Sequence, residues 1–266
     1  MKNMYDNLEI TLSTFITKDT KLNADFVTGL TEAEGSFSIT KHKETKAQDK
    51  VNIGLRFKLT MLSNEIDLLQ GVKLFFFNCG FITANKDGSV YFLVRDIKSL
   101  NDIIIPHFVN YPLRGTKYLD FINFKDAINL INNKDHLTIV GIDKLIKIST
   151  GMNSFIIHDK SCSPSHTIKS NINYIPINGH FVNGFIAGDG CLSLSITDTN
   201  FARMSLQISQ HKNNKLLLLS IANHIIKYIT MILIQYSLLW VVLKFEKMLY
   251  LIIFVNILYM ELKLFD

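Results

Sequence analysis

Two carboxylates, Glu34 and Asp189, occupy the same place in a stretch of sequence that occurs twice in the chain. The first copy covers residues 26–37 and the second covers residues 181–192. In each copy the apolar residues are spaced as in a helix, and the carboxylate is the last residue before a glycine. Carboxylates at a helix C-terminus are unfavourable, because the helix dipole is negative at that end. An unfavourable charge placed twice indicates a positive group between the two, most simply a divalent metal ion.

Small residues spaced four apart explain how the two carboxylates could meet. Each stretch carries one such pair, Gly29 with Ala33 and Gly184 with Gly188. Helices with small residues at i and i+4 can pack almost backbone against backbone. The sequence therefore predicts two packed helices with adjacent carboxylates. The following glycines, Gly35 and Gly190, are expected to end the helices in the left-handed cap conformation.

The first copy begins a run of elements in the order helix, hairpin, helix, hairpin, followed by two more helices. Asn23 or Asp25 can cap the first helix, and Ser63 can cap the second. Apolar and polar residues alternate in the strands, and residues 86–89 (Lys-Asp-Gly-Ser) are typical of a hairpin turn. The first predicted helix ends at about residue 34, and the other three cover 64–77, 118–131 and 137–150. The predicted strands cover 36–42, 51–61, 80–86 and 89–96.

The second copy repeats the helix and the first hairpin, with strands predicted at 192–197 and 202–210 and a further helix at 214–224. From about residue 225 the chain becomes apolar, with no glycine after Gly190 and no proline after Pro176. The second hairpin of this half has therefore lost its usual turn residues. With the residues that follow Phe181, counterparts of the last two helices of the first half are not expected.

Three explanations of this apolar tail are open. A shifted reading frame or eroded coding sequence is favoured over a diverged but folding second half and over a membrane-seeking segment. The apolar runs, 229–243 and 248–260, are shorter than the roughly 20 residues that a spanning helix needs. A membrane partner is therefore not expected.

One face of each predicted sheet is polar, and such a face fits the major groove of DNA. The candidate DNA-binding residues are Ser36, Ser38, Thr40, His42, Arg56, Lys58 and Thr60 in the first half and Ser193, Ser195, Thr197, Arg203, Ser205 and Gln207 in the second. An ordinary solvated sheet carries similar residues. The pattern therefore favours DNA only in combination with the paired carboxylates.

The bulk properties are compatible with this interpretation. The chain has 266 residues and a net charge of +5, which suits a nucleic acid or an anionic surface as partner. Its three cysteines form no paired framework, which favours a reducing compartment. The first 20 residues are expected to carry neither an Arg-rich leader nor an apolar signal core.

The two copies together resemble the motif of LAGLIDADG homing endonucleases in the form with two motifs in one chain. The acid, the small residues, the following glycine and the spacing all recur, and the resemblance covers roughly residues 25–210. It implies an α+β fold of two αββαββα half-domains related by a pseudo-twofold axis, each with a DNA-binding antiparallel sheet, the second truncated or diverged. The boundaries expected are a lead-in at 1–21, the first half-domain at 22–151, a linker at 152–179 and the second half-domain at 180–266.

The resemblance also implies site residues and partners. Glu34 and Asp189 would bind Mg²⁺, with the backbone carbonyls of Ala33 and Gly188 completing the metal shell, and would hydrolyse one phosphodiester bond per strand of double-stranded DNA. Lys117 would lie by the active site and stabilise charge at the phosphate, with a solvated lysine at a helix end equally expected. Gln210 would order water near the metal. Met61 stands at the equivalent place in the first half.

Three functions remain open from the sequence. The first is a monomeric, site-specific homing endonuclease encoded in an organellar, mitochondrial intron. The second is an intron-RNA maturase on the same scaffold, which would bind its own intron RNA without needing both acids. The third is an inactive remnant with a frameshifted C-terminus. The two retained carboxylates favour the nuclease over the maturase, whereas the missing second lysine segment favours the remnant.

Overall fold

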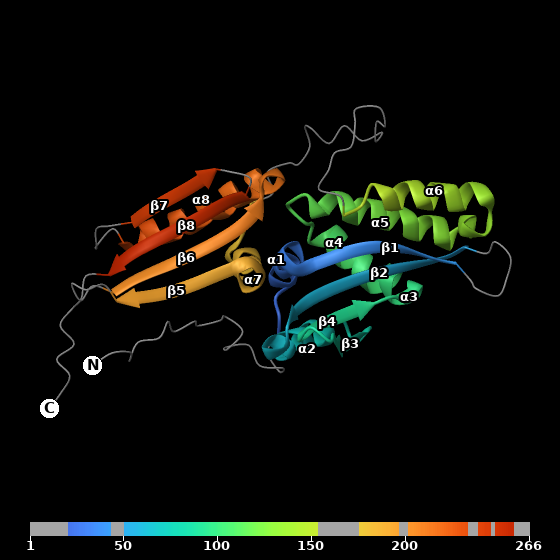
Figure 1. The fold of residues 1–266 in the computed structure, drawn as a ribbon, viewed down its shortest axis with the longest axis horizontal. Coiled ribbons are helices and arrows are strands. Elements are labelled where there is room, and N and C mark those ends of the chain that lie inside the picture. Colours follow the sequence, from blue (N-terminus) through green and yellow to red (C-terminus); the bar gives the residue numbers. More distant parts are fainter. Residues whose placement is uncertain are drawn as a thin grey trace.

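The computed structural model describes residues 21–43, 51–153, 176–196, 202–233, 239–245 and 248–257. Most of the expected lead-in and linker lies outside these ranges, and so does Thr197. Two helices, α1 (Ala24–Glu34) and α7 (Gly179–Asp189), stand at the middle of the molecule with one sheet on either side (Figure 1). The two copies of the repeated stretch thus lie where the two halves meet.

The first half contains every helix and strand predicted for it. After α1 come β1 (Gly35–Lys43), β2 (Val51–Leu62), α2 (Ile66–Phe75), β3 (Phe81–Ala84), β4 (Ser89–Val94), α5 (Lys117–Asn132) and α6 (Ile139–Thr150). The sequence analysis missed a short stretch between β4 and α5, formed by α3 (Ile97–Ser99), a π-helical turn (Leu100–Ile104) and α4 (Ile105–Asn110). Pro106 near the start of α4 and the short length of these elements conceal their helical period.

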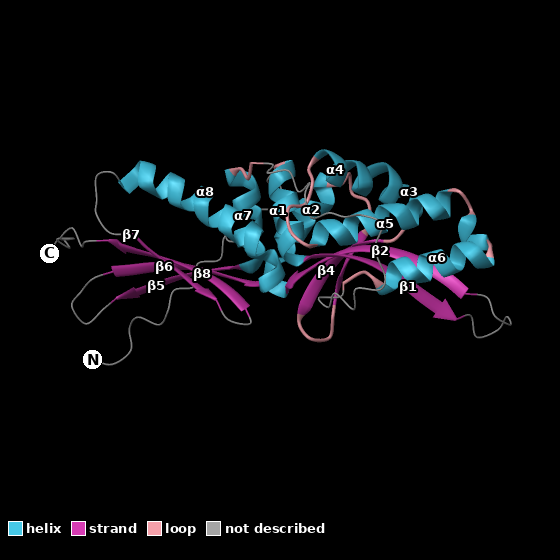
Figure 2. Ribbon diagram, turned by 90° about the horizontal axis from the view of Figure 1, so that it is seen from above, coloured by secondary structure: helices cyan, strands magenta, loops and turns pink. Residues whose placement is uncertain are grey.

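The second half repeats the sheet of the first. It contains β5 (Gly190–Ile196), β6 (Ala202–His211), α8 (Lys215–Leu233), β7 (Leu239–Phe245) and β8 (Met248–Ile257). The strand order is β1-β2-β4-β3 in one sheet and β5-β6-β8-β7 in the other, and all pairs are antiparallel. Figure 2 shows the helices along one side of the two sheets and the strands along the other.

The apolar tail is therefore part of the second sheet. Strand β8 pairs with β6 from Ala202↔Ile257 to His211↔Met248, and β7 pairs with β8 along its whole length. This pairing fits a diverged but folding second half, and it goes against the favoured expectation of a frameshifted tail. The runs of Val, Ile, Phe and Tyr that read as an anomaly have high strand propensity. In the part of the chain that the structure describes, no helix combines the length and apolar character needed to cross a membrane.

The first half has an aromatic core under its sheet. Phe37 on β1 is fully buried, with ring centroids 5.2 Å from those of Phe57 and Phe124 and 5.4 Å from that of Phe108. The alternation predicted for β1 and β2 is confirmed, because Leu55, Phe57 and Leu59 are buried as well. Burial of these rings on one face fixes the register and leaves the polar residues of both strands on the other face.

Helices α1 and α7 pack as closely as the sequence predicts. A Cβ atom on Gly29 would overlap the carbonyl oxygen of Phe181, and a Cβ atom on Gly184 would overlap the carbonyl oxygen of Phe26. These two contacts are reciprocal, as expected across a twofold axis. The N-cap residue of α7, Asn178, donates from Nδ2 to Asp25 in the first turn of α1 at 2.8 Å. The halves are therefore joined through helix backbones at Gly29 and Gly184.

Two predictions about helix ends are wrong. Gly35 and Gly190 are extended, with φ of −79° and −89°, rather than left-handed. Glycine is needed there for space, because a Cβ atom would lie 2.5 Å from the carbonyl oxygen of Thr31 or Ile186. Ser63 is not the N-cap of α2; it begins a 3₁₀ turn, and Glu65 precedes the α-helix without a side-chain cap. Asn23 is the N-cap of α1, accepting from the N–H of Asp25 at 2.9 Å.

Candidate functional site

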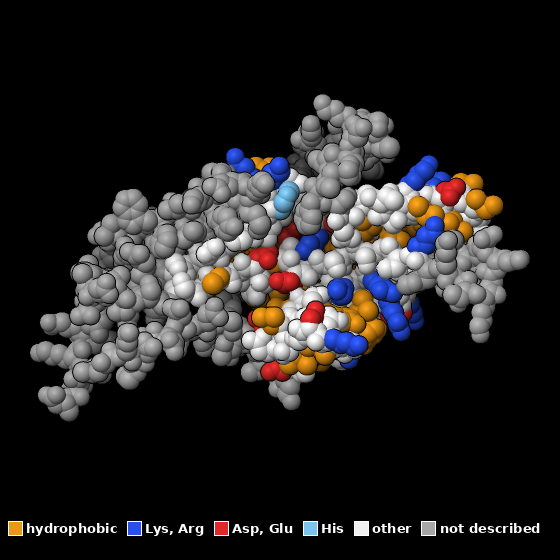
Figure 3. Space-filling model, viewed as in Figure 1, with side chains coloured by type: hydrophobic (Ala, Val, Ile, Leu, Met, Phe, Trp, Pro, Cys, Tyr) orange, Lys and Arg blue, Asp and Glu red, His pale blue; other side chains and the backbone are white. Residues whose placement is uncertain are grey.

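The site is built where the C-terminal ends of α1 and α7 meet. A Cβ atom on Gly188 would lie 2.5 Å from the Cβ of Ala33 and 2.9 Å from the Cγ of Glu34. Each helix then ends in its carboxylate, Glu34 on α1 and Asp189 on α7. Figure 3 shows acidic side chains near the middle of this face, with Lys and Arg side chains around them. Close helix packing therefore brings the two carboxylates into one place, as the repeated sequence predicts.

Both carboxylates are held in a setting that disfavours their charged form. Burial, with the charge of Asp189 as the next cause, raises the pKa of Glu34 from 4.5 to about 7. Burial also raises the pKa of Asp189 from 3.8 to about 6, although the charge of Lys117 and a hydrogen bond from Gln210 oppose the shift. Two partly buried acids with raised pKa values need a positive partner to ionise together.

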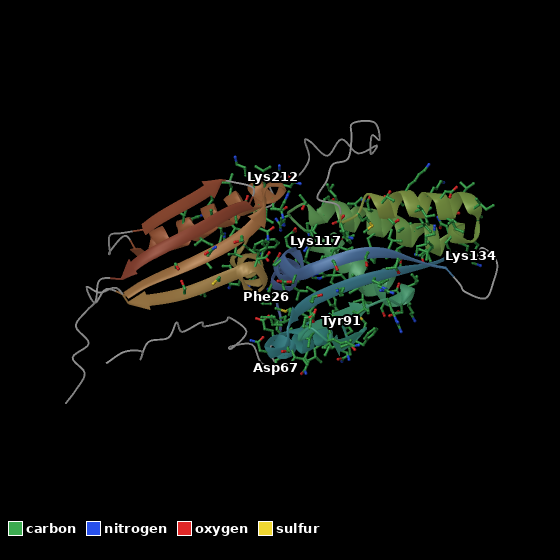
Figure 4. All side chains as sticks on the ribbon, in the orientation of Figure 1. Phe26, Asp67, Tyr91, Lys117, Lys134 and Lys212 are labelled. Carbon is green, nitrogen blue, oxygen red and sulfur yellow. The ribbon has the colours of Figure 1, made fainter. Side chains whose placement is uncertain are left out.

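Lys117, the first residue of α5, lies near α1 (Figure 4), and its side chain is half-buried. Its Nζ donates to the carbonyl oxygens of Thr31 at 3.0 Å, Glu32 at 2.8 Å and Ala33 at 3.0 Å. These contacts use all three N–H donors of the ammonium group. Burial lowers the pKa of Lys117, and the charges of Glu32, Asp189 and Glu34 oppose that shift.

Lys117 lies close to both carboxylates, at the place where the sequence expects a lysine by the active site. Its ammonium binds backbone carbonyls in the last turn of α1, which neither expectation included. A cation at a helix C-terminus compensates the negative end of the helix dipole, and here it does so next to Glu34. Ala33, expected to offer its carbonyl to a metal, already accepts a hydrogen bond from Lys117.

Glu32 is almost fully buried, with 2 % of its surface exposed, and anchors the turn before α5. Its Oε2 accepts from the backbone N–H of Arg114 at 2.8 Å and of Gly115 at 3.1 Å. Burial raises its pKa, opposed first by the charge of Lys117. Glu32 therefore holds the turn that supplies Lys117.

Gln210 reaches Asp189 directly. Its Nε2 donates to Oδ2 of Asp189 at 2.5 Å, and its Oε1 accepts from Nδ2 of Asn214 at 2.7 Å. Asn214 in turn accepts at Oδ1 from the backbone N–H of Thr116 at 2.9 Å. Asn214 was not among the residues selected from the sequence. A single asparagine after a strand has no spacing that marks it, and only the packing of the two halves places it beside Thr116.

Met61 stands at the place of Gln210 in the first half, since each is the next-to-last residue of its strand, β2 or β6. Met61 is 6 % exposed and packs in the core of the first half. A thioether cannot reproduce the amide hydrogen bond that Gln210 gives to Asp189. The two halves therefore support their carboxylates differently.

The first sheet presents the expected polar face. Register pairs Ser36 with Lys58 and Ser38 with Arg56, so these residues share one side of the sheet. The side chain of Thr40 donates to the carbonyl oxygen of Gly54 at 3.1 Å. Thr60 is half-buried, and the side chain of His42 lies outside the described part of the chain.

The register adds candidates that the sequence analysis missed. Thr60 is paired with Tyr91, and Tyr91 is paired with Thr83, which extends the face across β4 and β3. Nζ of Lys58 lies 5.3 Å from the ring centroid of Tyr91. Aromatic Tyr91 reads as core in the sequence, and only strand pairing reveals which side it faces. This face therefore spans all four strands, with Leu93 and Phe81 on the same side of the sheet as Lys58.

The second sheet repeats this face in its first two strands. Register pairs Ser193 with Ser205, whose hydroxyl groups are 2.5 Å apart, and pairs Cys191 with Gln207. Ser195 pairs with Arg203 in the backbone, and their side chains are not described. Ser193, Ser205 and Gln207 therefore lie on one face of β5 and β6.

No cluster of three or more His, Cys, Asp or Glu side chains suited to a metal occurs in the described part of the chain. The carboxylate pair is thus the candidate metal site, and the remaining ligands would come from backbone carbonyls, water and a bound substrate. Phosphate oxygens commonly complete such a shell around Mg²⁺. This donor set suits a metal that binds together with a nucleic acid.

The comparisons with known proteins agree on one family. The sequence model described as LAGLIDADG endonuclease matches residues 27–128 and 182–261. The second segment extends through β7 and β8, so the apolar tail lies within the family match.

Two curated relatives and one solved structure illustrate the similarity. A probable intron-encoded endonuclease 2 of Neurospora crassa is 33 % identical over 215 residues, which cover 75 % of this chain and 47 % of the relative. An uncharacterised 50.9 kDa protein in intron 1 of ND4 of Podospora anserina is 35 % identical over 136 residues, 50 % of this chain and 30 % of the relative. The chain thus spans less than half the length of these two relatives.

Among solved structures, the meganuclease I-SmaMI bound to uncleavable DNA superposes with a TM-score of 0.71 and 25 % identity. The superposition covers 89 % of this chain and 80 % of the meganuclease chain. Both halves of the fold, including the second sheet, therefore have a counterpart in a DNA-bound protein.

Proposed function

This chain belongs to the LAGLIDADG endonuclease family, and from that membership we propose that it is a site-specific homing endonuclease that hydrolyses both strands of a long DNA target. The observation that carries the proposal is the meeting of Glu34 and Asp189 at the packed ends of α1 and α7. Each half supplies one carboxylate, and a duplex has two strands to cut. The number of carboxylates therefore equals the number of strands that have to be hydrolysed.

The sheets support the choice of double-stranded DNA as substrate. Polar pairs such as Ser36 with Lys58 and Ser193 with Ser205 lie on the sheet faces, and side chains of these types can bind base edges in a major groove. I-SmaMI, which shares the fold, was solved bound to DNA. Because one chain carries both motifs and both sheets, we infer that it acts as a monomer.

A divalent ion, Mg²⁺ in the cell, fits the donor set. Glu34 and Asp189 would hold it, and the charge of the ion would oppose the burial that raises the pKa of both carboxyl groups. The carbonyls of Ala33 and Gly188 would be further ligands, Ala33 through the lone pair that does not accept from Lys117. The ion would activate a water molecule and stabilise the leaving oxygen.

Residues around the carboxylates would orient them. Lys117 fixes the last carbonyls of α1 and so the position of Glu34. Gln210 fixes one oxygen of Asp189, which leaves the other free for a ligand. Glu32 holds the turn that carries Lys117. These contacts keep two acids close together before substrate arrives, which is the preorganisation that phosphoryl transfer requires.

The same observations bear on the alternatives. An intron-RNA maturase needs a basic surface but has no use for two carboxylates held together at an energetic cost. A remnant with a frameshifted end would not be expected to keep the strand pairing of β6, β8 and β7. We therefore place the nuclease first. Similarity to proteins encoded in introns, one of them in the mitochondrial ND4 gene, supports a mitochondrial, intron-encoded origin.

The test is cleavage of a DNA that carries the insertion site of the chain's own intron, without the intron. With the purified full chain and Mg²⁺, we expect a linear product with both strands cut, and we expect EDTA to abolish it. A plasmid with the intron still inserted is the matched substrate control, because the target is split there. Equal cutting of both plasmids, or cutting that survives EDTA, would contradict the proposal.

A further inference from the structure

Four successive residues, Arg114 to Lys117, contact both halves of the molecule, and we call them the 114–117 turn. The N–H groups of Arg114 and Gly115 bind Glu32 of the first half. The N–H of Thr116 binds Asn214 of the second half at 2.9 Å, and Lys117 returns to the end of α1. The turn belongs to the first half, but its residue Thr116 contacts the second half.

From Thr116 a chain of hydrogen bonds continues to the carboxylate of the second half. Asn214 accepts from Thr116 and donates to Oε1 of Gln210 at 2.7 Å, and Gln210 donates to Oδ2 of Asp189. Both amide groups thus use one acceptor and one donor. The path begins at a backbone N–H and ends at a carboxylate.

The direction of these hydrogen bonds follows from which groups can donate and which can accept. A backbone N–H can only donate and an ionised carboxylate can only accept, so each amide between them has one orientation that satisfies both neighbours. Turning the Asn214 amide would set its NH₂ against the N–H of Thr116. Turning the Gln210 amide would set its oxygen against Asp189. The ends of the chain therefore determine the orientation of both side chains.

Gly115 shows that the turn packs tightly against Asn214. A Cβ atom at this position would lie 2.9 Å from Oδ1 of Asn214, 2.6 Å from Oε1 of Glu32 and 2.9 Å from Cδ2 of Leu217. The backbone of the turn therefore packs directly against the second half. This packing is independent of the hydrogen bonds and keeps Thr116 within reach of Asn214.

We propose that Asn214 is a positioning residue that couples the 114–117 turn of the first half to the orientation of Asp189 in the second half. This inference rests on the proposed function for its consequence in cleavage, but the coupling itself belongs to the protein without metal or DNA. In the first half, Lys117 binds the end of α1 and Met61 is buried. In the second half, Asp189 is held through Gln210 and Asn214, and Asn214 is bound by Thr116 of the first half.

The variant that isolates this role is Asn214→Asp, because it keeps the size of the side chain and the acceptor for Thr116. An aspartate cannot donate to Gln210, so the amide of Gln210 loses its orientation toward Asp189. The matched control is Asn213→Asp, which adds the same charge one residue away on an exposed side chain. Only the first substitution breaks the hydrogen-bond chain.

The first readout needs no catalysis. In NMR spectra of the full chain without metal, the side-chain NH₂ of Gln210, assigned through its loss in Gln210→Leu, is expected to be protected from solvent exchange. Asn214→Asp should remove this protection, and Asn213→Asp should retain it. Protection that survives in Asn214→Asp would overturn the proposal, whether or not the protein cuts DNA.

The second readout is single-turnover cleavage, compared with DNA affinity in Ca²⁺ and with thermal stability. We expect Asn214→Asp to cut about 10- to 100-fold more slowly, as for loss of a partner that orients a ligand, with DNA affinity and melting temperature close to those of the wild type. Normal cleavage with a broken Gln210 contact would overturn the positioning role. If the wild type itself does not cut, the proposed function fails, and the NMR result alone decides the coupling.

Discussion

The ends of α1 and α7 carry the same motif, but the two halves neutralise them in different ways. At the end of α1, an ammonium group from Lys117 binds three backbone carbonyls. At the end of α7, an amide from Gln210 binds the carboxylate of Asp189 itself. The backbone symmetry of the two halves thus does not extend to the groups that hold the acids.

This difference shows which structural features the two halves share. The reciprocal overlap of Gly29 with Phe181 and of Gly184 with Phe26 depends on backbone geometry, and both halves obey it. The neighbours of the carboxylates lie on elements that vary between the halves, such as β2 with Met61 and β6 with Gln210. Symmetry therefore brings the acids together, and asymmetric neighbours set their environment.

The largest expected effect tests the shared part. Gly29→Ala and Gly184→Ala should each destabilise the protein by at least about 3 kcal/mol, because each new Cβ meets a backbone carbonyl that cannot move alone. Urea denaturation measures the free energy of unfolding. Gly151→Ala is the control, since its Cβ would have an ordinary contact at 3.6 Å. A large cost at only one of the two interface glycines would break the symmetry.

Lys117→Met should have the next largest effect, because it removes the ammonium group from the end of α1. The structure describes such a contact only in the first half. The substitution removes three hydrogen bonds to carbonyls beside two acids, so we expect a loss of about 2–4 kcal/mol in unfolding free energy. Cleavage should fall by about 100-fold or more. Lys144→Met, an exposed lysine on α6, serves as the control. Stability equal to that of the wild type would show that the ammonium is not needed at the helix end.

Exchanging the residues at the ends of β2 and β6 should give intermediate effects. Met61→Gln places an amide in an apolar core and should cost about 1–3 kcal/mol in unfolding free energy. Gln210→Met should instead reduce cleavage by about 10- to 100-fold with little change in stability. If Met61→Gln raised the cleavage rate without destabilising the fold, the two positions would be equivalent after all.

The smallest expected effect concerns pH. Because the pKa of Glu34 rises from 4.5 to about 7 and that of Asp189 from 3.8 to about 6, the folded protein binds more protons than the unfolded chain between about pH 4 and pH 7. These two groups therefore make the metal-free protein less stable as pH rises through that window. The double variant Glu34→Gln/Asp189→Asn removes this contribution.

Thermal melts at a series of pH values measure the effect, which we expect to be a few degrees. His107 titrates in the opposite sense, because burial lowers its pKa to about 4, so the comparison with the double variant is essential. Added Ca²⁺ at pH 8 should raise the melting temperature of the wild type and leave that of the double variant unchanged. Identical pH profiles for the two proteins would contradict the assigned environment of the acids.

Much of this arrangement could be predicted from residue spacing. The glycines and small residues four apart predicted the packed helices, and the alternation of Phe57 with Lys58 predicted the two faces of the first sheet. These features are local and periodic. The resemblance of the two motifs to a known family supplied the rest of the prediction, including the roles of the carboxylates.

What the sequence could not predict depends on contacts between distant residues. Asn214 and Thr116 are far apart along the chain, and no local pattern pairs them. The three carbonyls that Lys117 binds cannot be predicted from the sequence either, because they become its neighbours only when α5 packs beside α1. The tail was interpreted as anomalous because strands β7 and β8 lack the turn residues and alternation by which strands are recognised.

The most direct test of the central claim is strand-resolved cleavage of a target duplex that carries a different label on each strand. The wild type, Glu34→Gln and Asp189→Asn are compared under single-turnover conditions with Mg²⁺, and DNA binding is measured in Ca²⁺. The account predicts that the wild type cuts both strands and that each amide variant binds the duplex but loses metal-dependent cleavage. If Glu34→Gln still cut both strands at the wild-type rate, the meeting of the two carboxylates would not be the active site.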